Sequence, residues 1–439
     1  MNDPHTRRPN AGSKSRRHFL KSSLAAIATP VIVPASALGR QDKTSPSDRI
    51  TVGIIGCGKM ANDYHIPELL RFDDVQVVAV FDVDTTRRDH ALGRVNEAYA
   101  EKNLNQVCDT YNDFRDIISR DDIDAVCIAT PDHWHATPLI EACKAGKDVY
   151  CEKPLTLTIA EAKRCIDAAR KYERVVQTGS QQWSNAMGPF REAVEIIRSG
   201  RLGKIRRVTV GVGGPSSPCD LPPERLEPGL DWNMWLGQAP IRPYHSVLSP
   251  RGVHDHFPAW RSYQEYSGGG HTDMGAHHYD IAQWALQWDH SGPSQIIPPE
   301  DADATTGVRF IFPGGIEVTH GGPDGCEFHG ENGRLYINRG KLESDPESIV
   351  KEPLGEHDVK LPHSQGHHRN WLDCIRSRET PVADVEYGAR TVTIVHLGNL
   401  AYWHRRTFQW NPQTWVFGDK ADNKLLDRER RDPWQLPEV

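Results

Sequence analysis

Three side chains in the sequence have the types needed to oxidise an alcohol. An imidazole such as that of His277 titrates near neutral pH and can accept a hydroxyl proton. Lys153 can hold the substrate oxygen while negative charge develops on it. Asp273 lies four residues before His277, so on one helix both side chains would face the same site. The alternative is a surface lysine beside a proline turn and a solvated helix face.

A glycine-rich turn could bind a dinucleotide beside these residues. The apolar run 50–55 leads into residues 56–61, which follow a Gly-x-Gly-x-x-Ala pattern. Gly56 would allow a tight bend, Gly58 would let the backbone approach a pyrophosphate, and Ala61 would keep the next helix close to the sheet. The start of that helix offers free N–H groups and a positive dipole end to phosphates. The predicted cofactor contacts of this turn are Gly56, Gly58, Lys59, Met60 and Ala61.

An acidic residue after the second strand predicts which dinucleotide is bound. The strand at residues 75–81 ends in Asp82, where a carboxylate would accept hydrogen bonds from an adenosine ribose. A surface or turn acid is the alternative reading of Asp82. A carboxylate at this point repels a ribose 2′-phosphate, which favours NAD over NADP. Arg87 and Arg88 are close enough in sequence to weaken that preference, so NADP stays open.

The elements that must position these residues form an α/β chain of two domains. Strands and helices alternate over residues 49–172, which predicts a Rossmann domain with a parallel sheet. The carboxyl ends of its strands would bring Gly56, Asp82, Thr130 and Glu152 together, with Lys153 where a nicotinamide ring would lie. Residues 173–410 lose the alternation and predict an α+β domain on a largely antiparallel sheet. Residues 411–439 form a polar tail.

The N-terminal residues predict export. Arg16 and Arg17 form a twin-arginine pattern, followed by an apolar run at 22–33 and a small-residue cleavage site at 35–37. We interpret residues 1–37 as a twin-arginine signal peptide and 38–48 as a linker, which makes the protein periplasmic or otherwise exported. No other segment of the sequence is apolar for long enough to span a bilayer.

Composition narrows the classes of ligand. The net charge of -7 over 439 residues, without charged blocks, argues against nucleic acid or anionic lipid as the main partner. The nine cysteines are scattered, as buried thiols would be, and clustered histidines are not expected to bind a metal. The 12 tryptophans and 21 histidines favour a carbohydrate ligand, although many of these aromatic residues could be core. The predicted substrate contacts are Trp183, Tyr263, His271 and His278.

Taken together, the motifs resemble the Gfo/Idh/MocA oxidoreductase family. The resemblance rests on the turn at 56–61, Thr130-Pro131 with His135, Glu152-Lys153-Pro154, and residues 273–280. It covers nearly all of the chain after the signal peptide. It implies a Rossmann domain, a C-terminal domain whose open sheet packs in dimers or tetramers, NAD(P), and a sugar, cyclitol or related polyol. The cofactor contacts that it adds are Thr130, Pro131, His135, Glu152 and Lys153, and the reaction centre is Lys153, Asp273 and His277.

Three hypotheses for the function follow. The first is an exported NAD(P)-dependent oxidoreductase acting on a secondary hydroxyl of a sugar, cyclitol or sugar derivative. The second is an enzyme with tightly held NAD recycled in each turnover, either between two sugars or in glycoside cleavage by oxidation, elimination, addition and reduction. His271 or a nearby tyrosine would then supply an extra base. The third is a non-catalytic sugar-binding module, against which the intact Lys153 and His277 argue.

Overall fold

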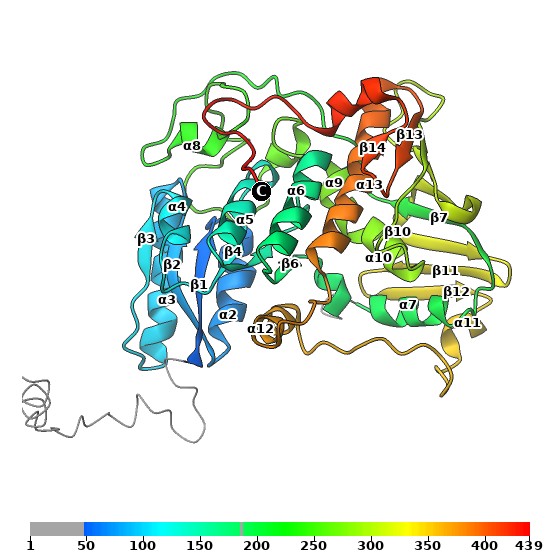
Figure 1. Cartoon of the computed structure of the whole chain (residues 1–439), viewed down its shortest axis with the longest axis horizontal. Helices are drawn as coiled ribbons and strands as arrows, with labels where there is room; N and C mark the ends of the chain where they lie inside the picture. The colour runs from blue at the N-terminus through cyan, green and yellow to red at the C-terminus, as the bar shows by residue number, and fades with distance from the viewer. Residues whose placement is uncertain (1–47, 185–187) are drawn as a thin grey trace, which may run out of the picture. The chain divides into compact units, whose positions relative to one another are not determined.

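Two β-sheets organise the residues that the computed structural model describes, 48–184 and 188–439 (Figure 1). The predicted signal peptide and all but the last residue of the predicted linker lie outside the described residues. Within residues 48–184 and 188–439, no helix combines the length and apolarity that crossing a membrane requires.

The first sheet has six parallel strands in the order β3-β2-β1-β4-β5-β6. Its central strands are runs of buried apolar residues, as expected for a sheet covered by helices on both faces. The sheet extends past residue 172, the predicted domain boundary, because β6 pairs with β5. The strands are β1 Ile50–Ile55, β2 Val75–Phe81, β3 Asp109–Tyr111, β4 Ala125–Ile128, β5 Asp148–Cys151 and β6 Val176–Thr178.

The helices α3, α4 and α6 between these strands each begin at a capping side chain. Asp84 accepts hydrogen bonds from the first backbone N–H groups of α3, and Thr158 with Glu161 forms a capping box on α6. Tyr111 ends the edge strand β3, and α4 starts after its cap Asp113. The helical segments are η2 Ala61–His65, α2 Ile66–Leu70, α3 Thr85–Glu101, α4 Phe114–Ile118, η3 Asp132–Trp134, α5 Ala136–Lys144 and α6 Ile159–Lys171.

The second sheet has eight strands, and every pairing in it is antiparallel. Its order is β12-β11-β10-β9-β8-β13-β14, and β7 also pairs with the long strand β10. Two strands come from the end of the chain, so the polar tail expected from residue 411 takes part in the sheet. The strands are β7 Ile205–Gly211, β8 Gln295–Ile297, β9 Arg309–Ile311, β10 Glu317–Gly330, β11 Gly333–Asn338, β12 Lys341–Asp345, β13 Phe408–Asn411 and β14 Val416–Phe417.

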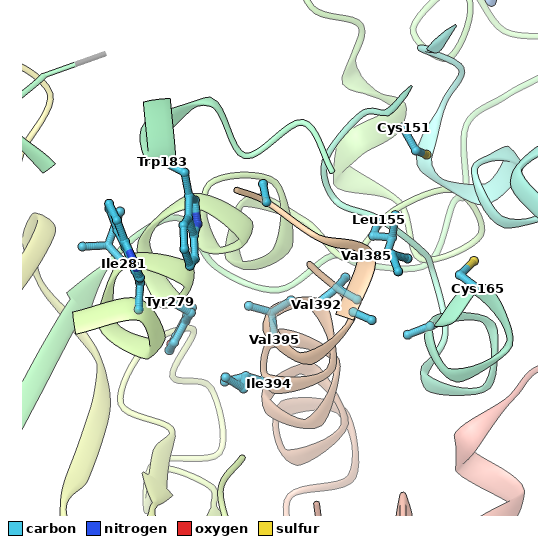
Figure 2. Close-up of a cluster of buried hydrophobic side chains, with 14 of the residues drawn as sticks. Cys151, Leu155, Cys165, Trp183, Tyr279, Ile281, Val385, Val392, Ile394 and Val395 are labelled. Carbon is cyan, nitrogen blue, oxygen red and sulfur yellow. The ribbon is translucent and has the colours of Figure 1, made fainter. Parts of the chain in front are cut away.

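The long helix α13 lies between the part of the chain with the parallel sheet and the part with the antiparallel sheet. It packs against α6 of the first part and α10 of the second (Figure 1). Figure 2 shows Val392 and Val395 of α13 between Tyr279 of α10 and Leu155 on the side of the parallel sheet. Each fully buried aliphatic side chain of this kind contributes about 1.5–3 kcal/mol. The remaining helical segments are η4 Gln181–Ser184, α7 Phe190–Arg198, α8 Trp232–Leu236, η5 Ala259–Ser262, α9 Gly270–Asp273, α10 Gly275–Ala285, η6 Pro313–Gly315, α11 Ser348–Lys351, α12 His367–Ser377, α13 Val385–His404 and η7 Lys420–Leu426.

Candidate active site

A cavity of about 370 Å³ lies at the carboxyl ends of the parallel strands and is closed by loops from the second half of the chain. Its size and position are those of a ligand site in a doubly wound α/β fold. A loop at 248–261 contributes part of the wall. The predicted residues that line it are Gly56, Gly58, Lys59, Met60, Asp82, Thr130, Pro131, His135, Glu152, Lys153, Asp273 and His277.

The glycine-rich turn has the geometry that a pyrophosphate requires. Gly56 has φ of +94°, and a Cβ added there would lie 2.8 Å from the backbone nitrogen of Thr130. A Cβ added at Gly58 meets no atom within 4 Å, so the backbone is open to the cavity. Ala61 is fully buried where the helix packs on the sheet. The first turns of this helix are π-helical at Ala61–His65, a distortion common at functional sites.

Asp82 is held by the turn that it helps to shape. Its Oδ2 accepts a hydrogen bond from the backbone N–H of Cys57, and its Oδ1 accepts one from that of Asp84, both at 2.8 Å. Burial raises the pKa of Asp82 although Arg87 and these N–H groups act to lower it. The carboxylate lines the cavity with lone pairs left for a ribose.

The two arginines near Asp82 are occupied elsewhere. The Arg87 guanidinium donates to Ser249 Oγ at 3.1 Å and to the carbonyls of Pro250 and Gly252. Arg88 donates to side chains of its own domain, Asp89 and Asn112. Neither guanidinium is therefore free for a 2′-phosphate, and the buried Thr130 Oγ1 has no hydrogen-bond partner among the described residues. This open turn and the unpaired hydroxyl fit NAD.

The predicted reaction centre is assembled in the cavity. Lys153 Nζ donates to Asp273 Oδ1 at 2.7 Å and to the Asp273 carbonyl at 3.1 Å. Arg261 Nε lies 3.6 Å from the same Oδ1. Burial alone would raise the pKa of Asp273, but the Lys153 and Arg261 cations hold it below its ordinary value. Asp273 is thus an anion that fixes the ammonium of Lys153 in the cavity.

His277 is a buried, neutral imidazole in this arrangement. Its ring is buried, and Nδ1 has no hydrogen-bond partner among the described residues. Burial, followed by the nearby cations of Lys153 and Arg339, lowers the pKa of His277 well below its ordinary value. A helix break at Met274 separates Asp273, at the end of α9, from His277 in the first turn of α10. The two residues face one cavity although they do not lie on one continuous helix.

Glu152 and His135 support the loop that carries Lys153. Glu152 Oε2 accepts a hydrogen bond from the Lys153 backbone N–H at 3.1 Å. The ring nitrogens of His135 lie 2.7 Å from the Pro154 carbonyl oxygen and 2.9 Å from that of Thr130. These contacts connect the ends of β4 and β5, so both side chains position the lysine in addition to lining the cavity.

A buried histidine that no sequence motif marks is the partner of Glu152. His65 Nε2 lies 3.2 Å from Glu152 Oε1, which also accepts a hydrogen bond from Gln181 Nε2 at 2.8 Å. Burial would lower the pKa of His65, but Cys127 and Glu152 outweigh it and raise that pKa to about 10. Burial would likewise raise the pKa of Glu152, but the hydrogen bond and charge of His65 lower it. His65 and Glu152 are therefore a charged pair behind Lys153.

The structure does not bring the four predicted substrate contacts, Trp183, Tyr263, His271 and His278, to this cavity. Trp183 stacks on Trp284 with ring centres 4.3 Å apart and donates to Asp280 Oδ2 at 2.6 Å, within the core of Figure 2. The completely buried His271 has its ring nitrogens 2.9 Å from Asn399 Oδ1 and 3.1 Å from Tyr279 Oη.

The other two lie close to the cavity in sequence but outside it in space. His278 is one residue past His277, a rotation of about 100° on a helix, and it turns toward Phe190. Burial lowers the pKa of His278 to about 4. Tyr263 is half-buried in the packing of the loop cluster around Trp235 and Tyr266. Trp235, which the sequence placed in a loop that could line the pocket, does line the cavity. Sequence reasoning missed the other side chains that line it, which are Trp134, Phe257, Trp260, Arg261 and Arg339.

Residues 50–180 match the NAD-binding Rossmann fold of an oxidoreductase family, and residues 215–436 match the C-terminal alpha/beta domain of the same family. The chain therefore belongs to the Gfo/Idh/MocA oxidoreductases and has an NAD-binding Rossmann domain. In the part of the chain that the structure describes, no three His, Cys, Asp or Glu side chains gather as a metal site would need.

Individual relatives are similar to this chain over only part of its length or at low sequence identity. A glycosyl hydrolase family 109 protein of Shewanella pealeana is 31% identical over 174 residues, which cover 36% of this chain and 38% of that relative. An aldose-aldose oxidoreductase from Caulobacter crescentus has a TM-score of 0.55 at 18% identity, covering 82% of this chain and 99% of that one. The WlbA dehydrogenase of Chromobacterium violaceum, solved with NADH and UDP-GlcNAcA, has a TM-score of 0.56 at 18% identity, with coverage of 83% and 97%. At these identities the structural likeness shows the fold alone.

Proposed function

We propose that this protein is an NAD-dependent oxidoreductase acting on a secondary hydroxyl of a sugar, cyclitol or sugar derivative. The observation that carries the proposal is the Lys153 ammonium, fixed by Asp273, beside a neutral His277 in the cavity that the glycine turn opens onto. Bound NAD would supply the hydride acceptor. His277 takes the hydroxyl proton, and Lys153 holds the oxygen as it becomes a carbonyl. Asp273 keeps the ammonium at that point.

The first experiment compares Lys153→Met with Lys163→Met in a screen of sugars and cyclitols. Lys163 lies on α6 and pairs with Asp167 outside the cavity, so its substitution removes the same charge without touching the site. We expect Lys153→Met to lower kcat by about two to three orders of magnitude, as the loss of one group that stabilises developing charge does. Undiminished turnover in Lys153→Met would contradict the proposed reaction centre. Sugar binding without turnover in the unmodified protein would favour a non-catalytic binding module.

The named relative from Shewanella pealeana supports a second candidate, glycoside cleavage with NAD recycled in each turnover. The test is the nucleotide released when the purified protein is denatured before any cofactor is added. Stoichiometric NAD(H), with product formed from glycosides or sugar pairs and no net NADH, would favour recycling. A protein free of nucleotide that reduces added NAD with sugars would favour the ordinary dehydrogenase. His271 is not assigned as an extra base in either case, because it lies in the core.

We also propose that the protein is exported through the twin-arginine route and assembles as a dimer or tetramer. The support for export is the pattern at Arg16 and Arg17, and a tightly held cofactor would need a route that accepts folded cargo. Replacing both arginines with lysine should retain the protein in the cytosolic fraction of cells that express the full chain. Unchanged distribution between cell fractions would contradict export by this route. Light scattering of the purified protein tests the assembly.

A further inference from the structure

One cationic side chain in the cavity has no anionic partner. Five cations line the cavity, and four of them face a carboxylate: Lys59 with Asp63, Arg87 with Asp84, and both Lys153 and Arg261 with Asp273. Within residues 48–184 and 188–439, no carboxylate lies within ion-pair distance of the fifth cation, Arg339. Lys153 and Arg261 therefore share Asp273, whereas Arg339 lines the same cavity without an ion pair of its own.

The other carboxylates that line the cavity have hydrogen-bond or ion-pair partners of their own. Asp82 accepts backbone N–H groups, and Glu152 faces His65 and Gln181. Asp132 accepts a hydrogen bond from Ser267 Oγ at 2.6 Å. Glu152 also interacts with Lys153, and Asp132 with Arg261, but none of these carboxylates forms an ion pair with Arg339 in the described part of the chain.

Arg339 is held in place by the second sheet. It forms the turn between β11 and β12, where its backbone N–H donates to Asn338 Oδ1 at 2.7 Å and Gly340 turns the chain with φ of +71°. Arg339 lines the same cavity as His277, and its positive charge contributes to the lowered pKa of that ring. A guanidinium is a planar fork of N–H donors that matches an oxyanion with two hydrogen bonds.

We propose that the substrate of this site is an acidic sugar, whose carboxylate or phosphate group is bound by Arg339 while a ring hydroxyl lies between Lys153 and His277. This inference rests on the proposed function and names its substrate class. A sugar bearing one oxyanion would give Arg339 an anionic partner, whereas a neutral sugar would leave it without one.

The experiment uses matched sugars that differ only at carbon 6. Glucose, glucuronate and glucose 6-phosphate form one series, and galactose, galacturonate and galactose 6-phosphate form another. Calorimetric binding and turnover are measured for the wild type, Arg339→Gln, Arg339→Lys and Lys341→Gln. Lys341 is two residues from Arg339 on the same hairpin and pairs with Glu343, so its substitution removes one charge outside the cavity.

We expect the wild type to bind an acidic member at least about tenfold more tightly than the neutral sugar of its series, a preference that falls as salt rises. Arg339→Gln should abolish this preference mainly through KM, Arg339→Lys should keep part of it, and Lys341→Gln should keep all of it. The uronate and phosphate members show which oxyanion is preferred. Thermal unfolding of each variant shows that the hairpin is folded.

Two results would overturn the inference. One is equal affinity for the acidic and neutral members of both series in the wild type, and the other is a preference for acids that survives in Arg339→Gln. Efficient turnover of neutral sugars with either result would leave the proposed function standing without the acidic substrate. Acid binding that depends on Arg339, without turnover of any sugar, would support the anion site and count against the proposed reaction.

Discussion

Gly56 and Gly58 are two residues apart in the same turn, and the structure places a different demand on each. Gly56 has a positive φ and no room for a Cβ against the Thr130 backbone, so it is required by the fold. Gly58 has no positive φ, and its missing side chain leaves space only on the cavity side. The fold therefore requires a glycine at residue 56, whereas the glycine at residue 58 leaves room for a ligand to approach the backbone.

This difference predicts that one alanine substitution lowers stability and the other weakens NAD binding. Gly56→Ala should lower the free energy of unfolding by about 1–3 kcal/mol, the cost of strained backbone at a non-glycine residue. Gly58→Ala should leave the unfolding free energy of the nucleotide-free protein nearly unchanged but weaken NAD binding about tenfold or more, because its methyl group enters the pyrophosphate space. Urea unfolding and NAD titration measure the two effects. Equal NAD affinity in Gly58→Ala would contradict the assigned pyrophosphate position.

At the scale of elements, the loop at 248–261 closes the cavity over the parallel sheet and is anchored by a helix of the other domain. Arg87, in the first turn of α3, donates to the Ser249 side chain and to the carbonyls of Pro250 and Gly252. A loop released from this anchor would uncover the cofactor region of the cavity. Retention of NAD should therefore depend on Arg87 through the loop that it anchors.

Arg87→Ala should speed the dissociation of NAD by about tenfold, equivalent to roughly 1.4 kcal/mol of lost loop anchoring. Arg88→Ala is the matched control, because Arg88 lies in the same helical turn but donates to Asp89 and Asn112. Stopped-flow chase of bound NADH by excess NAD measures both rates. Identical rates in the two variants would show that the loop does not limit release.

At the scale of the whole molecule, buried neutral histidines make the packing between the two domains depend on pH. Burial lowers the pKa of His367 and of His396 to about 4. His367 Nε2 lies 2.9 Å from the Thr178 carbonyl oxygen, and His396 Nε2 lies 3.0 Å from that of Thr156. These contacts join α12 and α13 to segments of the first domain, so protonating either ring disturbs the packing between the halves.

The sign of the pH dependence follows from these lowered values. An unfolded histidine takes up its proton near pH 6.5, whereas these folded histidines resist it until about pH 4. Their contribution to stability is therefore fully present above pH 6.5 and is lost as the pH falls toward 4, at up to about 1.4 kcal/mol per pH unit for each histidine. Urea unfolding between pH 7.5 and 4.5 should show this decline. His396→Gln should reduce the slope of this decline by up to about 1.4 kcal/mol per pH unit. The exposed His90→Gln should leave the slope unchanged.

Local patterns were sufficient to predict much of the fold and the centre of the site. The α/β class, the parallel and antiparallel sheets and the NAD-binding Rossmann domain are confirmed, since strand and helix periodicities and glycine requirements act over a few residues. The convergence of Gly56, Asp82, Thr130 and Glu152 followed from the rule that parallel strands end at one edge. Lys153, Asp273 and His277 meet in the same cavity.

Packing decided which of the remaining polar and aromatic residues reach the ligand. Trp183 and His271 have the same residue types as plausible sugar contacts, but their hydrogen-bond partners Asp280 and Asn399 hold them in the core. Arg339 is 186 residues from Lys153 in the sequence and shares its cavity because a hairpin of the second sheet ends there. Residue type and spacing specify chemistry and local conformation, whereas burial and unpaired charge depend on contacts between segments far apart in the chain. Only the tertiary structure could therefore distinguish a hydrogen-bonded core histidine from one that lines the cavity, or an arginine in an ion pair from one without.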